Sequence, residues 1–123
     1  MKNESRLYLW LPPIIWMAAI FVLSSFSSLE VETFVPDLYL RKGAHLFEYA
    51  ILSLLYYRSI NKGFKDWSFY SSLLALIFSI LYAASDELHQ SFVPQRFASP
   101  VDVLIDSSGA FLAQFVLLLV RRR

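Results

Sequence analysis

Polar residues in the second quarter of the chain have types and spacings suited to acid–base or metal-binding chemistry. Arg41, His45 and Glu48 are separated by four and three residues, so on a helix they share one stripe. A histidine beside a carboxylate can exchange a proton near neutral pH or bind a metal through a ring nitrogen. A lone histidine is more often a satisfied core residue, so the interpretation rests on the three residues together.

Two later segments add acids and amides at helical spacing. Asp86 shares a stripe with His89 and Gln90, and Asp102 lies four residues before Asp106. Histidine with carboxylates suits zinc or manganese, whereas ligand sets made only of oxygen suit magnesium or calcium. The spacing differs from zinc motifs such as HExxH, so a divalent cation is one option that the sequence leaves unnamed. Its expected ligands are His45, Glu48, Asp86, His89 and Asp102.

The three segments together supply the candidate site residues. The candidates for catalysis are His45, Glu48, Asp86, Gln90 and Asp102. The candidates for ligand binding are Arg41, Lys42, Glu87, His89, Arg96 and Asp106. A guanidinium matches phosphate in bidentate geometry, so Arg41 or Arg96 would hold the phosphate of a substrate. For Lys42 and Glu87 we favour solvated charges at the level of the lipid headgroups.

The composition indicates the environment in which these residues must lie. Hydrophobic residues make up 57% of the 123 residues and charged residues 17%, whereas soluble domains have about 45–50% and about 25%. The mean hydropathy is +0.50. These values argue against a disordered chain, a coiled coil and a nucleic-acid-binding module, and they favour a membrane protein. The absence of cysteine excludes disulfides, thiolate metal sites and a cysteine nucleophile.

The distribution of charge predicts an all-α, integral membrane four-helix bundle that forms a single domain over 1–123. A membrane span needs about 20 residues, and the expected helices cover about 7–28, 42–60, 67–86 and 101–120. The second and fourth helices reach this length only if the polar residues near their N-termini lie at or inside the membrane. Pro12 and Pro13 fit either the first turn of a helix starting near residue 12 or a kink just inside the membrane.

Lysine and arginine predict the orientation of the bundle. Eight of the eleven fall at the N-terminus, around the 61–66 loop and at the C-terminus, whereas three (Arg41, Lys42 and Arg96) fall on the opposite side. The positive-inside rule therefore predicts cytoplasmic termini. The candidate site residues are then expected at the extracytoplasmic ends of the second, third and fourth helices. Gly109 and Ala113 continue the stripe of Asp102 and Asp106, so this face is expected to pack against neighbouring helices.

The polar segments also resemble those of the VanZ-like membrane proteins. That family has a Lys-x-x-His-x-x-Glu-Tyr element, then Asp-Glu-x-x-Gln leading to an Arg, then an Asp followed at short spacing by Asn or Asp and a Gly. The corresponding residues are Lys42, His45, Glu48, Tyr49, Asp86, Glu87, Gln90, Arg96, Asp102, Asp106 and Gly109. The resemblance covers about 7–120. The sequence departs from the pattern at Gln95, where Gly is frequent, and at Asp106, where Asn is common.

The resemblance implies a multi-pass protein of a bacterial plasma membrane with a role for these positions. The family is named for a small protein linked to low-level resistance to teicoplanin, a lipoglycopeptide antibiotic, and it has no agreed reaction. Three interpretations follow from the residues. The site belongs to an enzyme acting on a cell-envelope lipid or a lipid-linked cell-wall precursor; or it binds such a lipid, precursor or lipoglycopeptide without turnover; or the charges form a structural salt-bridge cap. The expected partners are membrane lipids, with no nucleic acid.

Overall fold

The structure is a computed structural model that describes residues 2–24, 37–92 and 100–121, with side chains described over 6–23, 43–92 and 100–120. Four helices account for almost all of these residues: α1 (Lys2–Ser24), α2 (Asp37–Asn61), α3 (Phe69–Gln90) and α4 (Pro100–Arg121). The described residues contain no strand, so the all-α prediction is confirmed. Helices α1 and α2 begin about five residues earlier than the sequence predicted. The predicted end of the first helix, at residue 28, lies outside the described residues.

Three of the helices are long and apolar enough to cross a membrane. The qualifying segments are Arg6–Leu23 in α1, Phe69–Gln90 in α3 and Pro100–Val120 in α4. Helix α2 has 25 residues, which at 1.5 Å per residue exceeds the bilayer core. It falls short in hydropathy because it carries polar residues such as His45, Glu48 and Arg58.

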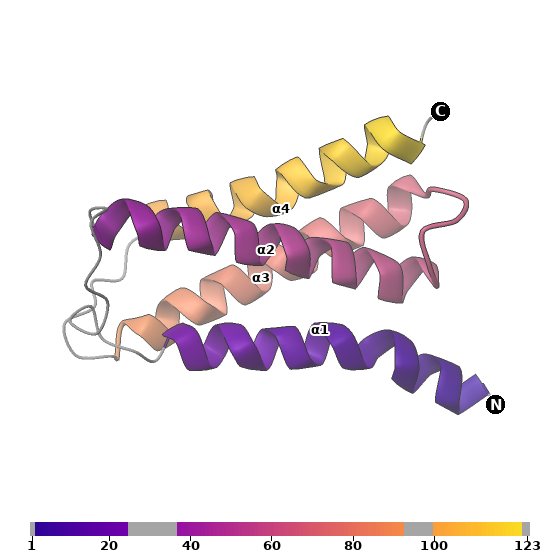
Figure 1. Cartoon of the computed structure of the whole chain (residues 1–123), viewed down its shortest axis with the longest axis horizontal. Helices are drawn as coiled ribbons and strands as arrows, with labels where there is room; N and C mark the ends of the chain where they lie inside the picture. Colours follow the sequence, from indigo (N-terminus) through magenta and orange to yellow (C-terminus); the bar gives the residue numbers. More distant parts are fainter. Residues whose placement is uncertain (1, 25–36, 93–99, 122–123) are drawn as a thin grey trace.

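Helix α2 runs through the middle of the bundle and packs against each of the other three helices (Figure 1). Its buried residues include Tyr49, Leu52, Ser53, Tyr56 and Tyr57, and their spacing of three and four residues is that of one helical face. The neighbouring helices therefore cover this face and shield its polar atoms from lipid.

The two ends of the bundle differ in the elements that meet there. The N-terminus of α1, the C-terminus of α4 and the turn between α2 and α3 lie at one end (Figure 1). The other ends of the four helices meet at the opposite end, which is where the polar segments of α2, α3 and α4 lie. This is the arrangement that the distribution of lysine and arginine required, whereas the side of the membrane on which each end lies stays a prediction.

Pro12 and Pro13 lie inside α1, which begins at Lys2, so they do not form the first turn of a helix starting near residue 12. Proline has no N–H, and Pro13 therefore cannot donate to the carbonyl of Leu9 four residues earlier. The hydroxyl of Ser59 in α2 donates to this carbonyl oxygen at 2.6 Å. A side chain of the central helix thus replaces the backbone hydrogen bond that the proline removes.

Small residues let α4 approach α2 closely, as the sequence predicted for the stripe that contains Gly109 and Ala113. Gly109, Ala110 and Ala113 are all buried. A Cβ placed on Gly109 would lie 2.9 Å from the carbonyl carbon of Leu46, closer than real Cβ atoms come to another residue. The main chains of α2 and α4 are therefore in direct contact one turn below Asp106.

Candidate functional site

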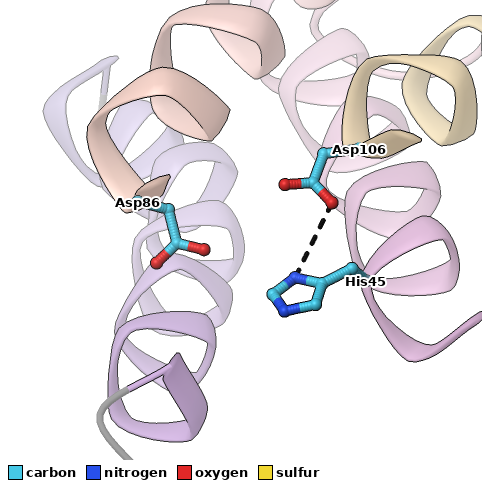
Figure 2. A group of neighbouring side chains, drawn as sticks. All are labelled: His45, Asp86 and Asp106. Atoms are coloured by element: carbon cyan, nitrogen blue, oxygen red, sulfur yellow. Dashed lines mark ion pairs between the residues drawn. The ribbon is translucent and has the colours of Figure 1, made fainter. Parts of the chain in front are cut away.

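One residue from each of three helices lies at the centre of the polar end of the bundle. His45 from α2, Asp86 from α3 and Asp106 from α4 point into the same space between the helices (Figure 2). Each offers one ligand atom, and these atoms all lie within 4.8 Å of one another. Asp86 and Asp106 are each only 3% exposed. We call these three residues the polar trio.

His45 lies between two acids. Its Nδ1 atom is 3.6 Å from Oε2 of Glu48, three residues along the same helix, and 3.7 Å from Oδ1 of Asp106 in α4. The first contact follows from helical spacing alone. The second depends on the close packing of α4 on α2 at Gly109. An imidazole placed in this way can carry a proton between the two carboxylates or bind an ion that they share.

Asp86 is oriented by two uncharged donors. The hydroxyl of Tyr49 donates to Oδ2 of Asp86 at 3.3 Å, and the amide nitrogen of Gln90 donates to the same oxygen at 3.4 Å. Tyr49 is completely buried. Neither donor carries a charge, so both orient the carboxylate without neutralising it.

Tyr49 is the residue that the candidate set omitted. Tyr49 belongs to the segment that resembles the VanZ-like pattern and directly follows Glu48, but it is not among the candidate site residues. Its position on the helix could have identified it, because successive residues of a helix are about 100° apart, so Tyr49 lies on the face next to that of Glu48. A buried tyrosine usually gives its hydroxyl a hydrogen-bond partner, which here is Asp86.

Helix α1 contacts the site from the side. The indole N–H of Trp16 donates to the carbonyl oxygen of Glu48 at 2.9 Å. The ring of His89 stacks on Phe21, with ring centroids 4.1 Å apart and an angle of 10° between the planes. His89 therefore faces α1, and it is not part of the polar trio although it shares a predicted stripe with Asp86.

The remaining candidates are placed less centrally or fall outside the description. Asp102 is half-buried one turn before Asp106. Glu87 is only 8% exposed, which differs from the solvated charge expected, because it lies on the buried face of α3 together with Asp86 and Gln90. Arg96 lies outside the described residues. Arg41 and Lys42 lie in α2, but their side chains are outside the description.

A cation suits this arrangement chemically. Of the predicted ligands His45, Glu48, Asp86, His89 and Asp102, the structure brings His45 and Asp86 close to Asp106, whereas His89 stacks on Phe21. Glu48 stands beside His45 as a further carboxylate. Several acids inside a bundle repel one another unless a proton, a basic group or a metal ion balances them.

Comparison with known proteins identifies the family. Neither the search of curated proteins nor the search of solved structures gives a match. The VanZ/LLP1 family model matches residues 3–121, which include all four helices apart from the first residue of α1. The match spans nearly the whole chain, and we conclude that the chain belongs to the VanZ/LLP1 family.

Proposed function

We propose that this protein binds the phosphate-bearing headgroup of a cell-envelope lipid at the polar trio and the residues around it. The lipid is a phospholipid or a lipid-linked cell-wall precursor of a bacterial plasma membrane, and in the cell this binding gives low-level resistance to a lipoglycopeptide such as teicoplanin. The observation that carries the proposal is the convergence of His45, Asp86 and Asp106 from three helices at one end of an apolar bundle.

The energetic cost of the acids supports a functional role. Placing one charged residue at the centre of a membrane helix costs about 2.5–3.5 kcal/mol on insertion scales, and less near the interface. Asp86 and Asp106 are buried within the bundle rather than turned toward the headgroups. An apolar residue at either position would avoid this cost, so a structural role alone gives little reason for both acids.

The apolar surface around the site favours a lipid ligand. Large hydrophobic side chains alternate with the polar residues and are exposed on the outer surface. They are Phe47, Leu88, Phe92, Val101 and Leu104, with Phe92 the most exposed at 80%. Acyl chains would contact these side chains while the headgroup reaches the interior polar residues. Exposed apolar side chains also occur at the opposite end of the bundle, for example Leu7 and Phe69, so this surface indicates contact with the bilayer, which gives the site access to membrane lipids.

The basic residues favour one orientation of the bundle in the membrane. The end opposite the polar trio carries both termini and the turn between α2 and α3, which hold most of the lysine and arginine. If that end is cytoplasmic, the trio lies at the level of the outer-leaflet headgroups. Cell-wall precursors are exposed on that face, and so are the targets of lipoglycopeptides.

The proposal is tested by expressing the wild type and three variants, His45→Ala, Asp86→Asn and Asp106→Asn, in a bacterial host. Lipids that copurify with the protein are identified by mass spectrometry, which separates phospholipids from lipid-linked precursors. Teicoplanin susceptibility and the amount of protein in the membrane are measured in parallel. We expect the variants to lose the bound lipid and the resistance at unchanged abundance.

The matched control is Asp66→Asn, an identical chemical change in the turn at the other end of the bundle, where Asn tolerates the positive φ of 56°. This variant should behave as the wild type. Loss of resistance in proportion to loss of protein would instead support the salt-bridge cap. A new lipid or precursor product in cells that express the wild type would show that binding leads to turnover.

A further inference from the structure

We infer that His45, Asp86 and Asp106 form a binding site for one divalent transition-metal ion, of the zinc or manganese class. The inference rests on the proposed function for the role of the ion, which is to hold the phosphate of the headgroup. The metal site itself rests on the types of the three ligands, their mutual distances and the elements that hold them.

The ligand types select the class of ion. One imidazole nitrogen with two carboxylates is a mixed nitrogen and oxygen set, which suits zinc and manganese. Magnesium and calcium prefer oxygen ligands alone. The chain has no cysteine, so the thiolate sites that favour copper(I) or iron–sulfur clusters do not compete for this assignment.

The distances are close to those of a metal site. Ligand atoms about 2.1 Å from a shared tetrahedral ion lie about 3.4 Å from one another. The ligand atoms of the trio lie within 4.8 Å of one another, and His45 and Asp106 are already 3.7 Å apart. A movement of less than about 1 Å by each side chain would bring all three into contact with one ion. Rotation about side-chain bonds is enough for a movement of this size.

The surroundings hold the ligands in the orientation that binding requires. Tyr49 and Gln90 donate to one oxygen of Asp86, as residues behind metal-binding carboxylates commonly do. Oε2 of Glu48 lies 3.6 Å from Nδ1 of His45, the same nitrogen that faces Asp106. Glu48 is therefore a further carboxylate on the side of the ion, where it adds negative charge that favours a cation. The backbone contact between Gly109 and Leu46 fixes α4 against α2, and with it Asp106 against His45.

A metal ion also resolves a conflict in the proposed function. Asp86 and Asp106 would repel the phosphate of a lipid headgroup, because all of these groups are negative. A divalent ion reverses the local charge and turns the same acids into support for phosphate binding. Three protein ligands leave further coordination positions, which a phosphate oxygen or water can occupy.

The test measures metal binding on the full chain in lipid nanodiscs. The protein is stripped with a chelator, and zinc, manganese, magnesium or calcium is added back separately. Bound metal is then counted by mass spectrometry and the affinity is measured by calorimetry. We expect about one equivalent of zinc or manganese per chain, with magnesium and calcium bound at least about tenfold more weakly. Cobalt added to the wild type should give the visible absorption typical of a low-symmetry site. This measurement uses the wild type alone, so it does not depend on whether a variant folds.

The variants His45→Ala, Asp86→Asn and Asp106→Asn should each lower the affinity at least about a hundredfold, while Asp66→Asn leaves it unchanged. A wild type that takes up none of the four ions, or trio variants that bind zinc as the wild type does, would overturn the inference. Metal binding with no bound lipid supports the metal site and rejects the proposed function. Lipid binding that persists after complete removal of metal supports the proposed function and rejects the role of the ion in holding the phosphate.

Discussion

Gly109 of α4 lies directly against the main chain of Leu46 of α2, with no room for a side chain between them. Gly109 is three residues from Asp106, and Leu46 follows His45. The contact between the two main chains therefore sets the separation of two members of the polar trio. It connects the packing of the bundle with the geometry of the site.

The substitution Gly109→Ala tests this relationship. The added methyl group would have to push α4 away from the backbone of Leu46, which cannot move aside as a flexible side chain would. Overpacking of this kind costs about 1–3 kcal/mol. We expect a corresponding loss in the free energy of unfolding, measured by denaturation in detergent micelles, together with weaker zinc binding. The matched control is Gly43→Ala, because a Cβ on Gly43 meets nothing within 4 Å. Equal effects of the two substitutions would contradict the close approach.

The sequence predicted the helices because charge-free runs and bilayer length constrain them strongly. It also predicted that the stripe of Asp106, Gly109 and Ala113 packs inward, since small residues and acids both avoid lipid. Spacing along one helix could not show which neighbouring helix each side chain meets. His89 and Gln90 lie three and four residues after Asp86, so both share its stripe. His89 nevertheless stacks on Phe21 of α1, whereas Gln90 donates a hydrogen bond to Asp86.

Two other features lay beyond the sequence for the same reason. The grouping of Asp106, rather than Asp102, with His45 depends on how far α4 slides along α2 before Gly109 meets Leu46. The carbonyl that Pro13 leaves without its backbone donor accepts from the hydroxyl of Ser59, 46 residues after Pro13. Ser59 lies in α2, and the sequence of α1 alone does not show that the two helices are in contact there. Both are tertiary relationships, and each is open to mutational tests.

Ser59→Ala should destabilise the protein by about 1 kcal/mol, because it leaves the carbonyl of Leu9 without its donor inside the bundle. The cost should largely disappear when Pro13 is replaced by Ala, since an N–H at residue 13 can donate to Leu9 within the helix. Pro12→Ala is the matched control, because its restored N–H faces the carbonyl of Tyr8. Unfolding free energies of the single and double variants provide the measurement. Rescue by Pro12→Ala as effective as that by Pro13→Ala would reject the explanation.

Gln114 links three helices in the interior of the bundle. Its amide nitrogen donates to the carbonyl oxygen and the hydroxyl of Ser53 in α2, and its amide oxygen accepts a hydrogen bond from Ser72 in α3. Gln114→Leu should cost about 1–2 kcal/mol of unfolding free energy, because hydrogen bonds between membrane helices contribute about 0.6–1.7 kcal/mol each. Ser53→Ala should lower the unfolding free energy less in the Gln114→Leu background than in the wild type, since the two residues share a hydrogen bond. Additive costs would show that the network does not act as a unit.

Tyr49→Phe separates orientation of the site from its formation. The variant keeps the buried ring but removes the hydroxyl that donates to Asp86, so we expect zinc affinity to fall about 10- to 100-fold. Abundance in the membrane should change little. Tyr57→Phe is the matched control, because Tyr57 is an equally buried tyrosine of α2 at the other end of the bundle, where its hydroxyl accepts from the backbone N–H of Ser68. A similar loss of zinc affinity in both variants would indicate a general loosening of α2 rather than orientation of Asp86.

The orientation of the bundle can be measured directly because the chain has no cysteine. Single cysteines at Lys65, in the exposed turn between α2 and α3, and at Phe92, exposed after the end of α3, mark the two ends. A membrane-impermeant maleimide should label Phe92→Cys in intact cells and Lys65→Cys only after the membrane is opened. The excess of lysine and arginine at the end that carries Lys65 is the physical reason, because these residues are retained on the cytoplasmic side. The opposite labelling pattern would place the polar trio at the inner leaflet. Metal binding by the trio would be unaffected by that result, but access to the extracellular targets of teicoplanin would be lost.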